Sequence, residues 1–570
     1  MGHMMAFNPG NGPAWRSRIF GVETDEKTPT GATGSTLVRN RQSKMEIPYR
    51  SLKRIHKMDV SQSLLQVDSL SPRANNAGSV RRKPVTELTI YYAMLLIVLC
   101  MILIPIWIVK YPGMLDYPNH LTRCYILAHY HDNPIWQQRY VLDHSPLPNL
   151  AIDIIVTPLL RFLPLIVAGK VFLSIAAALY VLGCSAVGRA VSGKPNWLAL
   201  VCAFTFYNSQ LIWGFVNYVF GVGVLLCAFA FWLRVRNRIS PLRFFLLCLL
   251  SLAAYLAHLS SLAILGIACC VIALLDFRRD RKARGLIVKL AWLACPLLIM
   301  EGFVKKNSGG GGGSVAWGPP IGKLTNLFAP VRSYSVTLDA GIIFVLLLCA
   351  WAMLKGSKVH SVALAGLVLF VLFLITPLVL FGLYPADVRY VIPAYMLLIL
   401  SIEPRWDRLQ KAALAVALIA MVIRTGSITA NWLTVNRRSE QVLAMGSVLP
   451  EGARIYVSHP PLDSMAKLDR GFIHIIELWT ISHDADISGF FATRGQQLVV
   501  RRQPLCDDSN EPKCLASYDY IWTYDPPESL RQELVPIAAQ AASWERITLW
   551  RVNQTKVSLE NPSGKTSSHF

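Results

Sequence analysis

The stretch from Tyr111 to Asp132, YPGMLDYPNHLTRCYILAHYHD, concentrates ionisable groups directly after the first long apolar block of the chain. Asp116, His120 and Arg123 are spaced i, i+4 and i+7, so a helix that begins early enough places them on one face. We predict that His120 and Arg123 contact the substrate beside Asp116. A carboxylate partly removed from water has a raised pKa and suits a general base that takes a proton from a hydroxyl at the lipid boundary. The alternative is that Asp116 only caps the helix.

Polar side chains in later loops suit the binding of a sugar. In YNSQLIWGFVNY, residues 207–218, the amides of Asn208, Gln210 and Asn217 suit hydrogen bonds to sugar hydroxyls. The alternative is a set of polar caps beside an ordinary aromatic belt. His258 ends an apolar block, and an ionisable residue at membrane depth is a functional candidate, although a structural role is an equal alternative.

The segment YPADVRY, residues 384–390, holds Asp387 and Arg389, and both are predicted to contact the substrate. An arginine suits a phosphate because its planar fork binds two oxygens and stays charged. We therefore predict that Arg389 contacts a phosphate, with an Asp387–Arg389 surface ion pair of little energetic value as the alternative. Lys305, Lys306 and Lys323 are further phosphate candidates or solvated surface charges.

These residues must be positioned by a protein of unusual composition. Hydrophobic residues make up 53% of the 570 residues and charged residues only 16%, against about 25% charged residues in soluble domains. The apolar residues come in blocks long enough to cross a bilayer, which predicts a polytopic membrane protein and excludes a cytosolic enzyme, a secreted disulfide scaffold and a fibrous protein. The formal net charge of +22 would suit nucleic acid, but cytoplasmic loops of membrane proteins collect Lys and Arg, so no nucleic-acid partner is predicted.

The predicted fold class is an α-helical polytopic membrane protein with about eleven transmembrane helices and a small extracytoplasmic α/β domain. With the amino terminus in the cytoplasm, every strongly basic short loop then falls on the cytoplasmic side. The predicted apolar blocks are 88–109, 168–190, 197–213, 215–233, 242–258, 260–276, 285–303, 338–354, 359–382, 386–402 and 411–428.

Four regions follow from this topology. We predict a disordered basic cytoplasmic tail over 1–87 and a transmembrane domain over 88–430 with outer loops 110–167 and 304–337. A periplasmic α/β domain over 431–556 and a disordered tail over 557–570 complete the chain. In this domain, the predicted strands are ARIYVS, QQLVVRR, YDYIWTY and ERITLWRV, and PESLRQELVPIAAQAA, residues 527–542, is a predicted helix. Within the loops, Ala151–Val167 is expected to be interfacial, and the glycines 309–313 form a flexible linker.

The cysteines and histidines give no metal signature. Nine cysteines lie in apolar blocks, where they behave as small hydrophobic residues. Cys506 and Cys514 would form a disulfide if their segment lies outside the cytosol. His129 and His131 face apart on a helix, so their spacing does not support a metal site. We predict no metal ligands and leave the cofactor unknown.

The motif Asp116-Tyr117-Pro118-Asn119-His120 resembles that of the GT-C class of integral-membrane glycosyltransferases. In that class, an acidic residue follows the first transmembrane helix and an amphipathic juxtamembrane helix comes next. The layout of helices and a carboxyl-terminal α/β domain is also similar, over about residues 88–556. Where several of those families carry an acidic pair, this chain has Asp116-Tyr117, so the resemblance supplies no second acidic metal ligand.

The resemblance implies an inner-membrane glycosyltransferase of the bacterial type. Asp116 is then the catalytic base, a polyprenyl-phosphate-linked sugar is the donor, and an envelope glycan or lipid is the acceptor. Arg389 stabilises the phosphate leaving group, and the bilayer holds the lipid tail. The alternative function is a polytopic transporter or a flippase of envelope precursors, although the sequence lacks the repeat symmetry common in transporters.

Overall fold

The computed structural model describes residues 85–280, 283–298, 314–380, 383–503, 512–515 and 517–553. Several predictions concern residues outside these ranges: those for the glycine run 309–313, for Lys305 and Lys306, and for a disulfide at Cys506. The predictions for the two terminal tails also lie outside them, except that residues 85–87 of the first tail form the start of the first helix.

The described chain is mainly helical, and each predicted apolar block corresponds to an apolar helix. By length and composition, 6 helices can cross a membrane, which agrees with the predicted membrane protein. The other five apolar helices have 10–17 residues, so the predicted number of eleven crossings stays a prediction. The helices that fit a full span are Glu87–Ile108, Leu165–Ser192, Val216–Val235, Leu259–Arg279, Val336–Leu354 and Arg408–Val448.

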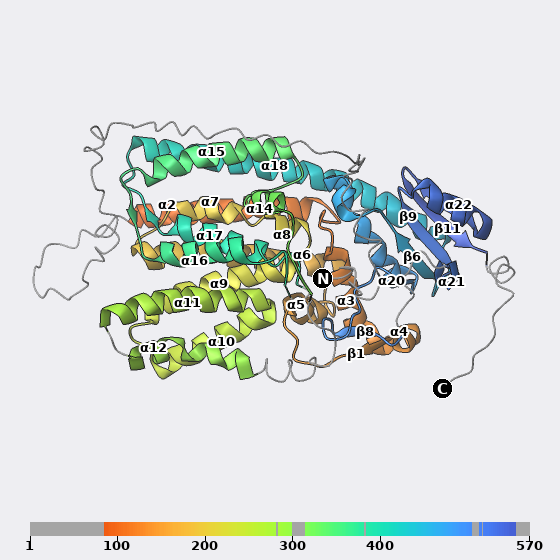
Figure 1. The fold of residues 1–570 in the computed structure, drawn as a ribbon, viewed down its shortest axis with the longest axis horizontal. Helices are drawn as coiled ribbons and strands as arrows, with labels where there is room; N and C mark the ends of the chain where they lie inside the picture. Colours follow the sequence, from red (N-terminus) through yellow and green to blue (C-terminus); the bar gives the residue numbers. More distant parts are fainter. Residues whose placement is uncertain are drawn as a thin grey trace, which may run out of the picture. The chain divides into compact units, whose positions relative to one another are not determined.

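Figure 1 shows these helices running alongside one another. Helix α9 lies in the middle of its group and packs on α6, α10 and α11, while α15 packs on α18 and α16 on α17. The bounds are α2 Val85–Ile108, α6 Leu165–Ser192, α7 Leu198–Phe204, α9 Val216–Val235, α10 Pro241–Ala257, α11 Leu259–Asp280, α12 Ala283–Leu290, α15 Val336–Leu354, α16 Val362–Ile375, α17 Val388–Leu400 and α18 Arg408–Ala444.

Small residues let α6 and α9 approach closely. A Cβ on Gly183 would lie 2.7 Å from Leu226, and one on Gly223 would lie 2.9 Å from Leu179. Such contacts suit helices in lipid, where packing rather than water exclusion holds helices together. On α15, by contrast, Phe344 and Leu347 are exposed, as expected for side chains that face lipid.

The segment after α2 forms short elements rather than a span. It contains α3 (Tyr117–His129), α4 (Pro134–Arg139), β1 (Tyr140–Leu142) and α5 (Ala151–Leu159). Helix α5 has nine residues, too few to cross a membrane, and the chain turns at Pro164 before α6.

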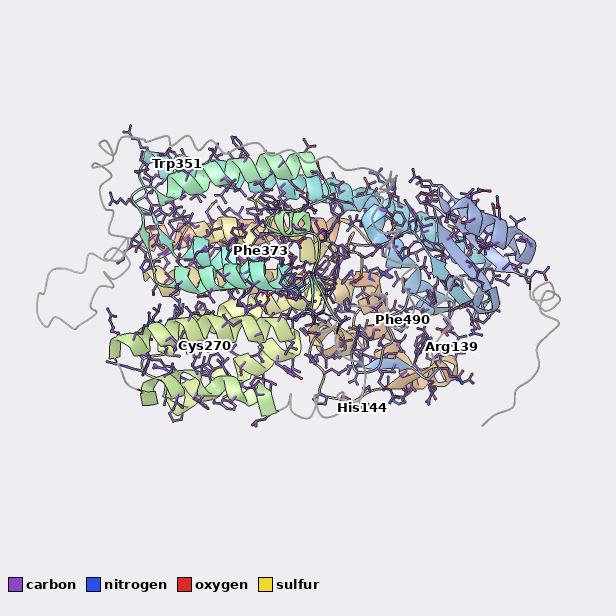
Figure 2. The ribbon with its side chains drawn as sticks, in the orientation of Figure 1. Arg139, His144, Cys270, Trp351, Phe373 and Phe490 are labelled. Carbon is purple, nitrogen blue, oxygen red and sulfur yellow. The ribbon has the colours of Figure 1, made fainter. Side chains whose placement is uncertain are left out.

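Strand β1 pairs antiparallel with β8 (Val499–Arg501), so the segment after α2 is joined to the carboxyl-terminal part of the chain. At this junction, Phe490 packs edge-on against Tyr140 with ring centres 5.6 Å apart. Arg139 donates to the carbonyl oxygens of Gly452 and Asp484, each at 2.6 Å (Figure 2). The sequence did not predict this pairing, because β1 has only three residues and no alternating pattern.

The carboxyl-terminal part holds a five-stranded mixed sheet in the order β10-β11-β9-β6-β7. Strand β6 runs parallel to β7 and β9, and the β9, β11 and β10 pairs are antiparallel. The bounds are β6 Arg454–Ser458, β7 Asp486–Ile487, β9 Tyr520–Tyr524, β10 Ala538–Trp544 and β11 Ile547–Val552, with α22 over Glu528–Ile537.

Three of the four predicted strands lie in this sheet, and the fourth, QQLVVRR, supplies β8 instead. The helix predicted over 527–542 is wrong in its second half. It ends at Ile537, one residue after Pro536, whose ring and missing N–H weaken the last turn, and the next residues form β10. The predicted domain boundary at 431 falls inside α18, which is 37 residues long and continues past it.

Candidate functional site

Asp116 lies in the turn between α2 and α3. It is the residue directly before α3, but its φ of −85° is helical and its side chain makes no capping hydrogen bond. The capping alternative is therefore wrong. The backbone N–H of Asp116 donates to the carbonyl oxygen of Trp213 at 3.1 Å. Gly214 makes this approach possible, since its φ is +89° and a Cβ there would lie 2.5 Å from the Asp116 nitrogen.

The Asp116 carboxylate is buried and faces a histidine from the far end of the chain. Its Oδ1 lies 3.8 Å from Nε2 of His474, which belongs to the 3-10 turn η6 (Ile473–Leu478). On the other side of the ring, His474 Nδ1 is 2.9 Å from Oε1 of Glu477. One imidazole therefore lies between two buried carboxylates.

Asn119 fixes this arrangement from α3. Its amide nitrogen donates to Glu477 Oε1 at 3.3 Å and to the Gly489 carbonyl oxygen at 3.2 Å, and its amide oxygen accepts from the Phe491 N–H at 2.9 Å. A second link joins the Thr122 hydroxyl to the Glu477 carbonyl oxygen at 3.1 Å. Because α3 and η6 are held together by these bonds, the separation of Asp116 and His474 is set by the fold.

The charges of this group are strongly coupled. Burial raises the pKa of Asp116, and the neighbouring His474 offsets part of that rise. Burial alone would lower the pKa of His474, but Glu477 and then Asp116 favour the imidazolium, so the pKa of His474 is raised. The raised pKa favours the protonated ring, in which Nδ1–H can donate to Glu477 and the second N–H faces Asp116.

Arg123 and His120 form a separate pair beside this group. The Arg123 guanidinium makes a bidentate ion pair with Asp153 of α5, at 2.6 and 2.9 Å. His120 Nδ1 lies 3.0 Å from Nη2 of Arg123. Burial and the Arg123 charge lower the pKa of His120 well below its usual value, so this ring is neutral. Arg123 is thus committed to Asp153, and its predicted contact with a substrate stays a prediction.

Arg389 lies in the first turn of α17 and is buried. It donates to the Tyr384 carbonyl oxygen at 3.2 Å and to the Ser260 hydroxyl at 3.4 Å, and its Nε has no hydrogen-bond partner in the described chain. None of the described carboxylates forms an ion pair with it. The predicted alternative of an Asp387–Arg389 pair is therefore wrong.

Asp387 instead pairs with Lys323, with Nζ 2.9 Å from Oδ2. Its Oδ1 also accepts from the Val388 N–H at 2.9 Å, which caps α17. Lys323 also donates to the carbonyl oxygens of Phe373 and Thr376. Both side chains are thus satisfied within the chain, and their predicted contacts with a substrate stay predictions.

A single turn connects Asp116 to Arg389. Trp213 accepts the hydrogen bond from Asp116, and its ring packs against Tyr384 with centres 6.0 Å apart. Two residues later, the Phe215 ring lies 6.0 Å from the Arg389 guanidinium. The Asp116 backbone and the Arg389 guanidinium therefore both contact the turn 213–215.

The predicted amides and His258 have mainly structural contacts. Asn208 caps α8 (Ser209–Ile212), and Asn217 bonds the backbone of Ile152 and Asn149. His258 accepts from the Ser260 N–H at 3.1 Å. Gln210 differs, because its buried Oε1 has no partner within the described chain. A substrate role for each of these four residues stays a prediction.

The described chain has no candidate metal site, because it contains no group of three or more His, Cys, Asp or Glu side chains that could hold a metal ion. His144, labelled in Figure 2, is exposed.

The sequence analysis did not identify His474, Glu477 and Asp153. The first two interrupt the apolar run FIHIIELW, and an ionisable pair spaced i, i+3 inside such a run was the available signal.

No protein-family model and no curated protein matches the chain. The solved structures that match the chain include two of one protein. The crystal structure of ArnT from Cupriavidus metallidurans bound to undecaprenyl phosphate is 13% identical, with a TM-score of 0.48 over 82% of this chain and 98% of that one. The same protein in the apo state is 12% identical, with a TM-score of 0.47 over 83% and 98%. This likeness concerns the fold alone and gives no residue of the chain its role.

Proposed function

We propose that the protein is a GT-C-type membrane glycosyltransferase that moves a sugar from a polyprenyl-phosphate donor to a hydroxyl of an envelope glycan or lipid. The observation that carries the proposal is the buried Asp116 carboxylate facing His474, together with the buried Arg389 guanidinium, which packs on Phe215 in the turn that also bonds the Asp116 backbone. A base and a phosphate-binding cation are the two groups that this reaction requires.

In the proposed reaction, Asp116 takes the proton of the acceptor hydroxyl. The acceptor oxygen forms a bond to the anomeric carbon of the sugar, and the bond from that carbon to the donor phosphate oxygen breaks. The electron pair of that bond leaves with the polyprenyl phosphate. Arg389 stabilises the charge that develops on the phosphate, because its Nε hydrogen has no partner in the described chain and donors fixed in a site of low polarity act strongly.

His474 and Glu477 have a positioning role in this proposal. A protonated His474 favours the ionised form of Asp116, which must be a carboxylate to accept a proton. Glu477 keeps the imidazole oriented and charged. The ring therefore opposes part of the effect of burial and favours the carboxylate form of Asp116.

The location follows from the same proposal. A lipid-linked donor explains the apolar helices, because the isoprenoid chain stays in the bilayer while its head group reaches the site at the end of α2. We propose an inner-membrane protein with a cytoplasmic amino terminus, in which the sheet region lies in the periplasm and carries His474 to the outer end of α2.

The test uses a strain in which the gene is deleted. Wild type and Asp116→Asn are expressed at equal levels, and envelope glycans and lipids are compared by mass spectrometry. We expect wild type to restore a sugar modification and Asp116→Asn to leave it absent. Asp132→Asn, which alters an exposed carboxylate of the same segment, is the matched control. Full restoration by Asp116→Asn would contradict the proposal and favour the transporter alternative.

A further inference from the structure

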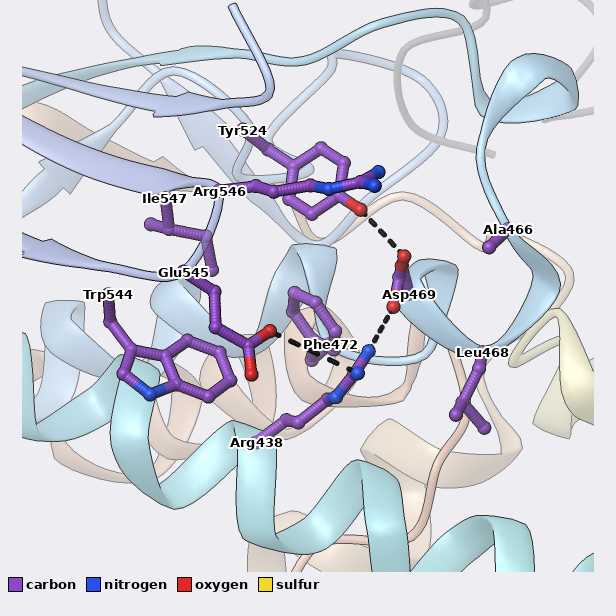
Figure 3. Close-up of a pocket in the computed structure, with 10 residues that line it drawn as sticks. All are labelled: Arg438, Ala466, Leu468, Asp469, Phe472, Tyr524, Trp544, Glu545, Arg546 and Ile547. Carbon is purple, nitrogen blue, oxygen red and sulfur yellow. Dashed lines mark hydrogen bonds and ion pairs between the residues drawn. The ribbon is translucent and has the colours of Figure 1, made fainter.

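A cavity lies in the carboxyl-terminal region, and Asp116 is not among its lining residues. It has a volume of about 440 Å³, a size that suits a small ligand. Figure 3 shows its walls, which come from α18, from the segment around α19 (Lys467–Arg470) and from the β10–β11 hairpin. The proposed reaction uses none of its lining residues.

Aromatic and apolar groups form part of the wall. Trp544 is half-buried at the end of β10, and Phe472 and Tyr524 are buried. Leu468 and Ile547 complete the apolar surface. An indole ring that is neither fully buried nor fully exposed offers a flat face to a ligand at low conformational cost.

Paired charged side chains form the rest of the cavity wall. Arg438 bonds Asp469, whose second oxygen accepts from the Tyr524 hydroxyl at 2.6 Å. Glu545 lies 4.0 Å from the same guanidinium, and Arg546 adds a second cation at the rim. Two arginines and two carboxylates balance, so the cavity gives no net attraction to a phosphate or another anion. It does offer planar donors and acceptors in fixed positions.

The backbone at the rim is held in an unfavourable conformation. Trp544 pairs with Ile547, so Glu545 and Arg546 form a two-residue hairpin loop. Glu545 has a φ of +50°, in a loop position where glycine is preferred. A side chain kept in such a conformation indicates a role beyond stability. Here it points a carboxylate into the cavity beside Arg438 (Figure 3).

We propose that this cavity binds a neutral saccharide, which stacks on Trp544 and exchanges hydrogen bonds with Glu545 and Arg438. Balanced charge, planar polar groups and an indole face are the chemistry that recognises hydroxyl-rich rings. That this saccharide is a unit of the acceptor rests on the proposed function. In support, one short segment lines the cavity with Asp469 and Phe472 and then supplies His474 to Asp116.

Binding is tested directly, with no donor present. The full chain in lipid nanodiscs is probed by saturation-transfer NMR with neutral tetrasaccharides of glucose, galactose, mannose and N-acetylglucosamine. We expect at least one to bind, and Trp544→Ala to weaken its binding at least tenfold. Trp550→Ala, which alters a half-buried tryptophan of the adjacent strand outside the cavity, is the matched control and should change affinity less than twofold.

Glu545→Gly separates binding from folding. Glycine relieves the positive φ, so this variant should unfold at a higher temperature while it binds the saccharide more weakly. The proposal is overturned if no tetrasaccharide binds wild type, if Trp544→Ala leaves binding intact, or if inorganic phosphate displaces the saccharide. Asp116→Asn should keep saccharide binding. Loss of transfer in that variant therefore tests the proposed function, and binding tests the cavity.

Discussion

Asp116 and Asp387 occupy the same position in two helices, and the fold uses them in opposite ways. Each stands directly before the first residue of a helix, α3 or α17, and each is buried. Asp387 caps its helix and pairs with Lys323 at 2.9 Å. Asp116 makes no capping bond and lies 3.8 Å from His474.

The difference shows what makes a carboxylate available for chemistry. A carboxylate that caps a helix and holds an ammonium has its charge satisfied and contributes to stability. Asp116 lies near an imidazole whose protonated form its charge favours, and burial raises the pKa of Asp116; in the proposed function, this environment lets it take a proton. The helix position is the same, so the contacts from elsewhere in the chain decide between the two roles.

The largest expected effect comes from Asp116→Asn. The amide cannot accept the proton, so turnover with purified protein should fall about 10³-fold, within the usual range for loss of a general base. The melting temperature should stay unchanged or rise, because a neutral amide is cheaper to bury than a carboxylate. A turnover within threefold of wild type would remove the distinction between the two aspartates.

Asp387→Ala should act on stability instead. It leaves Lys323 without its carboxylate, and breaking a largely buried pair should lower the free energy of unfolding by about 3 kcal/mol. Thermal unfolding in detergent measures this loss. The double variant Asp387→Ala, Lys323→Ala should lose less than the sum of the single variants. Strict additivity would show that the pair contributes nothing.

Arg389 and Arg123 allow the same comparison between a proposed role in the reaction and a role in stability. Arg389→Lys keeps the charge but loses the fork, so kcat/KM should fall about 30-fold, since hydrogen bonds to charged groups contribute about 2 kcal/mol. Arg123→Lys breaks the bidentate pair with Asp153 and should mainly lower the melting temperature. The reverse pattern, with Arg123→Lys harming turnover more than Arg389→Lys, would contradict the assignment of the phosphate to Arg389.

The smallest effect concerns the pH profile of His474→Gln. In wild type, activity should rise as Asp116 ionises and fall as His474, whose pKa is raised, loses its proton. Without the imidazolium, the carboxylate is harder to ionise, so the acid limb should move to higher pH, and the alkaline limb should disappear. An unchanged profile would show that the ring does not act on Asp116.

Much of the helical framework was predictable. Apolar blocks predict membrane helices because the length of a hydrophobic run is a local property, and all eleven blocks correspond to apolar helices. Three strands of the sheet were also visible as short alternating segments. The pairing of β1 with β8 was not predictable, since each strand has only three residues and the two lie far apart in the chain.

Asp116 was found from the sequence, because a motif within a few residues of the first apolar block needs no distant information. The sequence by itself determined the apolar helices and the acidic residue that follows the first of them. Only the tertiary structure decided which of two helix-start aspartates faces a histidine. Asn119 and Glu477 are 358 residues apart, and their contact forms only when α3 and η6 pack together. The environment of a buried charge depends on such distant partners, whereas the tendency of an apolar run to form a helix does not.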